Sequence, residues 1–186
     1  MPQTARDPEA PFGEDHGTGL TGAFAPVSDE VVLDAFHVEG EIPVDLAGVY
    51  LRNGPNPRFE PNGRYHPFDG DGMLHAAHFD RGRVVYRNRW IRTAAWQTEE
   101  RLGSSPYWGI MHSLKDRADL PMKDTANTDV IAHAGKAVAS WYLAGEPYLL
   151  DPFTLDTLGT APWTRRSGGF SAHPKVDAHT GELMFF

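Results

Sequence analysis

The chain has 186 residues, a formal net charge of -8 at pH 7 and a hydrophobic share of 40%. This length is enough for one domain with its own core, and no basic stripe exists to neutralise phosphates, which argues against a nucleic-acid partner. The sequence contains no cysteine, which excludes a disulfide framework, a zinc–thiolate site and a thiol nucleophile. We expect a cytoplasmic location, with which this composition is compatible.

The first 28 residues are predicted to be a flexible tail. From Met1 to about Thr21 they are polar and rich in glycine, proline and aspartate, and they lack the basic start and apolar middle of a secretory signal. No stretch of 18 or more apolar residues occurs anywhere, so we expect no transmembrane helix.

Strand patterns begin after this tail. Residues 48–52 alternate as a strand does, and dense turn signals follow at 53–57 and 66–73. Residues 73–79 and 83–90 flank the tight turn Asp80-Arg81-Gly82, which predicts a hairpin. Residues 92–124 show little periodicity, and we expect a long connection with one helical turn near 98–101.

A second unit of short strands follows at 128–133, 137–142 and 147–151, and the step Asp151-Pro152 closes it. Successive units of short strands joined by hairpin turns are typical of propeller blades of about 40–45 residues. The sequence ends at Phe186 inside the apolar strand pattern 181–186, and an exposed apolar strand is an aggregation hazard. We therefore expect a truncated chain, the N-terminal part of a larger protein.

His173 is the candidate metal ligand. It lies between Ala172 and Pro174, and the proline is expected to hold it in an extended backbone. A stiff extended segment is a good support for a metal ligand. A lone histidine near a turn is more often a surface or capping residue, so His173 by itself does not decide the function.

Four ordered stretches together resemble one family. They are residues 48–57, 68–75, 126–155 and 171–177, and they are similar to motifs of the carotenoid cleavage oxygenases, which include carotenoid, apocarotenoid and lignostilbene dioxygenases. The resemblance runs from about residue 30 to the last residue. It implies an all-β fold in which residues 29–186 form the N-terminal blades of an incomplete seven-bladed β-propeller.

The resemblance also implies an Fe(2+) ion on the propeller axis, held by four histidines without a carboxylate. His173 matches the first of these ligands, and the other three are expected beyond residue 186. The other histidines match no ligand motif, and His75 and His78 are expected on opposite faces of a strand. The implied reaction is O2-dependent cleavage of a conjugated carbon–carbon double bond into two carbonyl products. The implied partner is an apolar polyene, and peripheral membrane contact is plausible because carotenoids partition into bilayers.

One position departs from the family pattern. Leu143 stands where the family usually has a glutamate that accepts a hydrogen bond from an iron ligand, and Glu146 is three residues away. Without that acceptor an imidazole N–H loses its partner, so we expect impaired catalysis or a divergent subgroup. Stilbene-cleaving relatives often carry a lysine just before that glutamate, and Tyr142 here favours a carotenoid or apocarotenoid substrate.

Other interpretations stay open or fail on the residues. A non-catalytic propeller remnant without an intact iron site and a stilbene-cleaving enzyme remain alternatives. The stretch 69–72 lacks the ligands of an EF-hand, and we expect its aspartates to bond backbone amides. Ser171, His173 and Asp177 lack the Gly-x-Ser-x-Gly elbow of a hydrolase. Five aromatic residues either line an apolar tunnel or belong to the core: Tyr50, Phe68, Trp90, Trp141 and Phe170.

Overall fold

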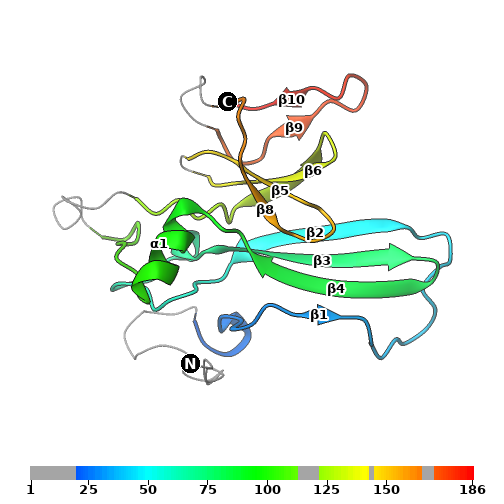
Figure 1. Ribbon diagram of the computed structural model, residues 1–186, viewed down its shortest axis with the longest axis horizontal. Helices are drawn as coiled ribbons and strands as arrows, with labels where there is room; N and C mark the ends of the chain where they lie inside the picture. The colour runs from blue at the N-terminus through cyan, green and yellow to red at the C-terminus, as the bar shows by residue number, and fades with distance from the viewer. Residues whose placement is uncertain (1–19, 113–121, 143–144, 165–169) are drawn as a thin grey trace.

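The computed structural model describes residues 20–112, 122–142, 145–164 and 170–186. Two four-stranded antiparallel sheets and a two-stranded hairpin dominate these residues (Figure 1). The expected all-β fold is thus confirmed for the described part of the chain, with one α-helix and two short 3-10 turns, Gly22–Phe24 and Pro67–Asp69, as additions.

The first sheet has the strand order β1-β4-β3-β2. Its strands are β1 (Val32–Leu33), β2 (Gly48–Pro55), β3 (Gly72–Asp80) and β4 (Arg83–Trp90). The β3–β4 hairpin lies where the sequence predicts it. Arg81 and Gly82 both have positive φ, 47° and 74°, which is the backbone of a two-residue turn that matches the twist of the paired strands.

The second sheet follows the chain, in the order β5-β6-β7-β8. Its strands are β5 (Asp129–His133), β6 (Lys136–Ser140), β7 (Tyr148–Leu150) and β8 (Thr157–Thr160), and a last hairpin pairs β9 (Lys175–Val176) with β10 (Leu183–Met184). The β5–β6 turn repeats the geometry of the first hairpin, with φ of 47° at Ala134 and 73° at Gly135.

One six-residue turn occurs twice, after β7 and after β9. In the first copy the Oδ1 atom of Asp151 accepts bonds from the amides of Phe153 and Thr154. In the second, Oδ1 of Asp177 accepts from the amides of His179 and Thr180. These amides lower the pKa of both aspartates. The β7–β8 and β9–β10 connections therefore have the same hydrogen-bonded turn.

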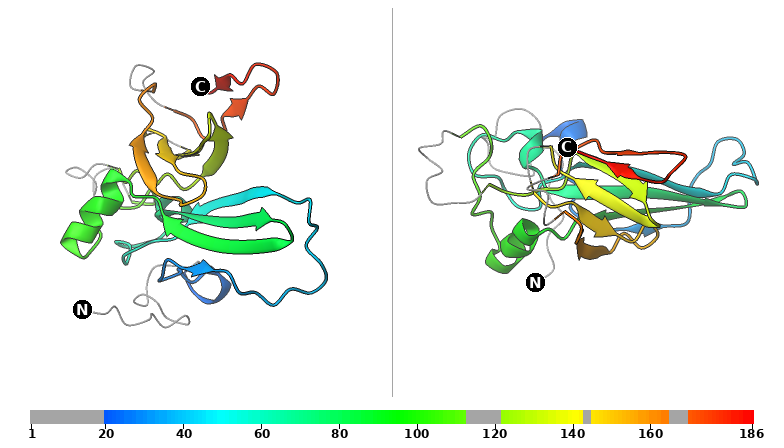
Figure 2. Two further views of the ribbon diagram at one scale, coloured as in Figure 1. Left: turned by 45° about the vertical axis from the view of Figure 1, so that its right-hand side comes forward. Right: turned by 90° about the horizontal axis from the view of Figure 1, so that it is seen from above.

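The core lies between the two four-stranded sheets, and the left view of Figure 2 shows the second sheet above the first. Alternate residues of β3 supply Leu74 and Ala76, and the second sheet supplies Ala137, Ala139 and Leu150. Each of these side chains is at most 1% exposed. The period of two along each strand places them all on the facing surfaces.

The connection between the sheets holds more helix than the sequence predicts. Helix α1 spans Ala94–Leu102, not a single turn at 98–101. Thr93 begins it by accepting a bond from the amide of Trp96 (3.0 Å), and Gly103 ends it with a φ of 70°. The sequence of α1 shows only a weak helical repeat of apolar residues, because the buried face of the helix includes the charged residue Glu99.

Part of the predicted tail is attached to the first sheet. Leu20 is buried, and Val27 exchanges two hydrogen bonds with the side chain of Asn56, at 2.7 and 2.9 Å. Residues 1–19 lie outside the described residues, so the flexibility of the tail stays a prediction. Among the helices of the described residues, none has the length and apolarity needed to cross a bilayer.

Candidate functional site

His173 lies in a bend directly before β9. Its φ is 62°, so the expected extended backbone is wrong. Two contacts close this bend: the amide of Ser171 donates to the carbonyl of Phe186 (3.0 Å), and the amide of Phe186 donates to Oγ of Ser171 (3.2 Å). Tertiary contacts therefore override the preference that Pro174 imposes, at a residue type that visits positive φ more readily than most.

The imidazole of His173 points outward from this fixed backbone. Its side chain is 66% exposed, whereas Ala172 and Pro174 on either side are buried. A ring on a backbone anchored at both sides loses little freedom when it binds a ligand. The geometry gives a surface imidazole that is available to a further group.

Asp129, at the start of β5, lies beside His173. Its Oδ2 atom is 3.4 Å from Nδ1 of His173, and its side chain is 25% exposed. Oδ1 of the same carboxylate accepts a bond from the amide of Val130 (2.9 Å), and the carbonyl of Asp129 accepts one from the side chain of Asn53 (3.1 Å). The sheet thus fixes the acid, and one carboxylate oxygen is directed to the histidine.

The donor chemistry of His173 suits Fe(2+), because imidazole is a common ligand of that ion. Within the described ranges, however, no three His, Cys, Asp or Glu side chains lie together in a way that could hold a metal ion. The assignment of His173 as a metal ligand therefore stays a prediction.

Two other histidines, both in β3, make contacts away from His173. His75 and His78 lie on opposite faces of β3, as predicted: Nδ1 of His75 lies 2.6 Å from the hydroxyl of Tyr86, and the ring of His78 lies 5.9 Å from that of Phe153. Burial lowers the pKa of both histidines, with a further lowering from a neighbouring arginine. Both rings pack against aromatic neighbours, and their burial disfavours the charged form.

The five candidate aromatic residues divide between core and surface. Trp90, Trp141 and Phe170 are at most 4% exposed, whereas Tyr50 is 65% exposed. Phe68 is half-buried and its ring centre lies 4.2 Å from that of Tyr142. The amide of Tyr142 is tied to Oγ1 of Thr128, the residue before Asp129 (3.1 Å). The Phe68–Tyr142 ring pair is thus connected, through the amide of Tyr142, to the residue before Asp129.

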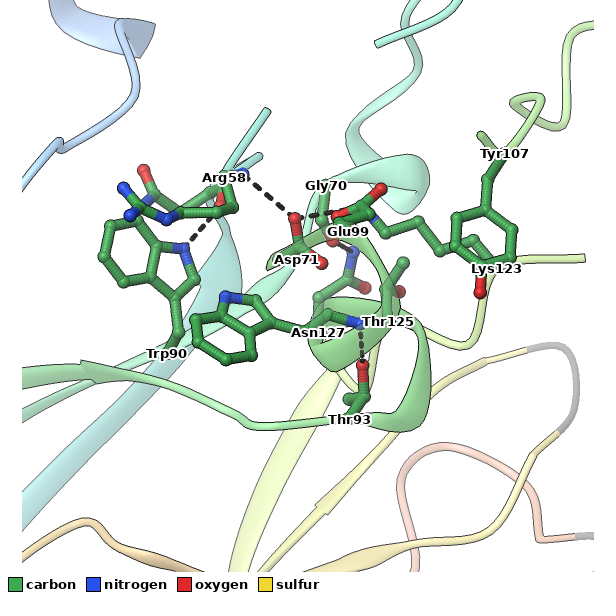
Figure 3. A network of polar contacts seen from close by, with 12 residues as sticks. Arg58, Gly70, Asp71, Trp90, Thr93, Glu99, Tyr107, Lys123, Thr125 and Asn127 are labelled. Carbon is green, nitrogen blue, oxygen red and sulfur yellow. Dashed lines mark hydrogen bonds and ion pairs between the residues drawn. The ribbon is translucent and has the colours of Figure 1, made fainter. Parts of the chain in front are cut away.

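A buried ionic cluster lies at the turn before β3 (Figure 3). Nζ of Lys123 lies 3.0 Å from Oδ2 of Asp71 and 2.8 Å from Oε1 of Glu99, and all three residues are at most 8% exposed. The amide of Arg58 adds a bond to Oδ2 of Asp71 (2.9 Å). The cluster ties α1 to the turn before β3 and to the segment before β5.

Burial shapes the protonation of this cluster. It raises the pKa of Glu99 to about 7, an effect that the nearby Asp71 increases and Lys123 opposes. Burial also raises the pKa of the neighbouring Asp124 to about 7. The two carboxylates near Lys123 hold its own pKa above the ordinary value despite burial.

In the turn at 69–72 an aspartate side chain accepts bonds from backbone amides, as predicted. Asp69 accepts bonds from the amides of His66 and Ile110, at 3.2 and 2.9 Å. Asn127 donates to the carbonyl of Gly70 (2.7 Å), which joins the turn to the segment before β5. A Cβ atom at Gly72 would lie 2.8 Å from the carbonyl oxygens of Thr125 and Ala126, so this approach needs glycine.

Two further positions considered from the sequence have different outcomes. The Ser171/His173/Asp177 set is not assembled as a triad, because His173 faces Asp129 and Oδ1 of Asp177 is taken by turn amides. Leu143 lies outside the described residues, so its role stays a prediction.

Sequence reasoning missed Asp129, Lys123 and Glu99. Asp129 stands inside a strand pattern with no motif to single it out, and its partner is 44 positions away. The buried charges of Lys123 and Glu99 look like ordinary surface residues in a segment without periodicity. Only the tertiary structure brings these side chains together.

Comparisons with known proteins agree with this geometry. The family model described as retinal pigment epithelial membrane protein matches residues 24–186. Isoeugenol monooxygenase of Pseudomonas nitroreducens is 39% identical over 173 residues, which cover 90% of this chain and 36% of that protein. Carotenoid 9,10(9',10')-cleavage dioxygenase 1 of Phaseolus vulgaris is 36% identical over 190 residues, covering 90% of this chain and 34% of the relative.

Solved structures show the same relationship. Lignostilbene dioxygenase of Pseudomonas brassicacearum superposes with a TM-score of 0.80 and 30% identity, over 94% of this chain and 37% of the other. A mutant of Synechocystis apocarotenoid oxygenase gives a TM-score of 0.72 and 34% identity, over 82% and 34% of the two chains.

The chain spans about a third of the length of the relatives it matches. Its sequence motifs, its sheets and these similarities agree. The chain belongs to the retinal pigment epithelial membrane protein family, the family of the carotenoid cleavage oxygenases.

Proposed function

We propose that the protein carrying this chain is an Fe(2+)-dependent dioxygenase that cleaves a conjugated carbon–carbon double bond of a carotenoid or apocarotenoid. The observation that carries the proposal is His173, an outward-facing imidazole on an anchored backbone with a carboxylate behind it. The chain would form the N-terminal blades of a seven-bladed propeller, with three further histidines supplied by the rest of the protein.

The proposed reaction balances without an outside reductant. The carbon–carbon double bond and the O–O bond break, and each oxygen atom enters one of two new carbonyl groups. Iron, when bound, would supply the site at which O2 is activated next to the alkene. This chain's own contribution would be to present the nitrogen of His173 and to fix its orientation.

A phenylpropenoid or stilbene double bond is the second candidate substrate. Among the relatives, isoeugenol monooxygenase and lignostilbene dioxygenase are named for such compounds. Tyr142 stands where stilbene-cleaving relatives often have a lysine, and its ring packs on Phe68. This apolar pairing favours the polyene as the first substrate to test.

Further partners follow from the substrate and the charge. An apolar polyene would be drawn from a membrane, so we propose peripheral membrane contact, and exposed apolar side chains such as Phe24 and Val44, each 76% exposed, are candidates for it. We propose no nucleic-acid partner, given the net charge of -8. A cytoplasmic location stays a prediction.

The test is O2-dependent cleavage by the longest natural polypeptide that contains this sequence. It would be incubated with Fe(2+), O2 and, in turn, an apocarotenoid, a stilbene and isoeugenol, and the carbonyl products would be measured. We expect cleavage of the apocarotenoid and none without O2. Absence of cleavage and of bound iron in that polypeptide would favour a non-catalytic propeller remnant, with Leu143 as one cause.

The 186-residue chain alone is expected to be inactive, because its described residues hold no complete ligand set. Cleavage by that chain alone would contradict the assignment of ligands.

A further inference from the structure

We infer that Asp129 is the positioning residue of His173, and that its carboxylate keeps the ring proton on Nδ1 so that the Nε2 lone pair faces outward for a metal ion. This inference rests on the proposed function, in which His173 is a metal ligand. Metal-binding histidines commonly donate their second N–H to an acceptor that fixes the tautomer. Asp129 lies within the stretch 126–155, but the resemblance assigns it no role in the site.

The first support is the directed geometry of the carboxylate. Its Oδ1 atom is occupied by the amide of Val130 at 2.9 Å, which leaves Oδ2 facing Nδ1 of His173 at 3.4 Å. That separation is slightly longer than a formed N–H···O bond of about 2.7–3.2 Å, and a small rotation of the exposed ring closes it. A carboxylate only accepts hydrogen bonds, so it favours the tautomer with the proton on Nδ1.

The second support is that both partners are held by separate anchors. Asp129 pairs with Ser140 in the β5–β6 ladder, and its carbonyl accepts the bond from Asn53 of β2. His173 is fixed by the bonds between Ser171 and Phe186. Their proximity therefore follows from the packing of the hairpin beside the second sheet and not from flexible surface chains.

The third observation in support is that the two sides of the His173 ring face different surroundings. Nδ1 faces the strand that carries Asp129, while the side chain as a whole is 66% exposed. A ring held in this way offers Nε2 to whatever lies beyond the described residues. In the proposed enzyme, this is the side from which the iron and its other ligands would approach.

The experiment is 15N NMR of the histidine ring nitrogens in the 186-residue chain without metal, at a pH where the imidazole is neutral. We expect the Nδ1–H tautomer to predominate at His173. In Asp129→Asn, the amide oxygen is expected to keep the bond from Val130 and the NH2 group to face Nδ1. This places a donor against Nδ1, so the Nδ1–H to Nε2–H ratio should fall by up to about fivefold, the scale of a part-exposed ion pair.

Two further variants complete the test. Asp129→Ala removes the acceptor and should also lower the ratio. Asp177→Asn is the matched control, because Asp177 accepts turn amides near His173 without pairing with it, and the ratio should not change. Predominance of Nε2–H in the wild-type chain, or an unchanged ratio in both Asp129 variants, would overturn the inference.

The result is separable from that of the proposed function. The tautomer is read without iron, substrate or O2, so an active enzyme with an Nε2–H tautomer would refute only the role of Asp129. An inactive protein with the Nδ1–H tautomer would refute only the proposed activity.

Discussion

Lys123 and Glu99 meet inside the protein, with 2.8 Å between Nζ and Oε1, although the helix that carries Glu99 ends well before Lys123. Asp71 adds a second carboxylate to the same ammonium group at 3.0 Å. One buried cation thus joins α1, the turn before β3 and the segment that leads to Asp129. The cluster therefore holds three segments that are far apart in the sequence in one buried contact.

Removing the cation should be costly. Lys123→Met leaves Asp71 and Glu99 buried without a counter-charge, and breaking a buried ion pair in this way costs about 3–5 kcal/mol. We expect a loss of that size in the free energy of unfolding, measured by urea denaturation. Lys175→Met, at an exposed lysine of β9, is the control and should change it by less than about 0.5 kcal/mol. Equal effects of the two changes would refute the role of the cluster.

The pH dependence of stability follows from the raised carboxyl pKa values. The pKa of Glu99 rises from an ordinary 4.5 to about 7, so the folded state binds its proton more tightly than the unfolded state. Glu99 therefore favours folding at acidic pH, and this contribution, of order 3 kcal/mol at most, is lost as pH rises from about 4.5 through 7. Asp124 acts in the same direction.

Urea midpoints between pH 5 and 8 would test this sign. Glu99→Gln keeps the shape of the side chain and removes its proton binding, so the decline in stability with pH should be shallower than in the wild-type chain. A decline of the same slope would show that Glu99 is ionised throughout this range.

Gly72 is expected to tolerate no side chain. Gly72→Ala would place Cβ 2.8 Å from two carbonyl oxygens and 2.9 Å from Ile91 Cδ1, and overpacking of this kind costs about 1–3 kcal/mol. Gly54→Ala is the matched control in β2, since its Cβ meets Arg52 at an ordinary 3.6 Å. Thermal unfolding should separate the two variants, and a wild-type melting temperature for Gly72→Ala would contradict the close approach.

The start of α1 depends on one hydroxyl. Thr93→Ala removes the acceptor for the Trp96 amide, and loss of such a cap costs about 0.5–2 kcal/mol. Thr98→Ala changes a half-buried threonine of the same helix, whose hydroxyl donates to the carbonyl of Ala94, and should cost less than about 0.5 kcal/mol. Chemical denaturation of both variants measures the difference, and the reverse order would refute the cap.

Local patterns in the sequence predict much of this fold. The hairpins at Arg81-Gly82 and Ala134-Gly135 follow from short strand patterns around glycine turns, and alternation places His75 and His78 on opposite faces. The length of α1 is missed because its buried face carries Glu99, a charge that is satisfied only by distant residues.

The candidate site can likewise be predicted only where it depends on local sequence and not on distant contacts. His173 is found because its motif is local in sequence. The prediction of an extended backbone at His173 is wrong because hydrogen bonds between Ser171 and Phe186 bend the chain. No local sequence pattern contains these contacts. Asp129 is missed because a single aspartate within a strand pattern carries no signal until the hairpin packs beside it.

The most direct test of this account is the iron content of the longest natural polypeptide that contains this sequence, with and without His173. Elemental analysis should find close to one iron per chain in the wild-type protein and a strong loss in His173→Ala. His179→Ala, at an exposed histidine of the neighbouring turn, should keep its iron. Full iron content in His173→Ala would contradict the assignment of His173 as a ligand, and with it the proposed site.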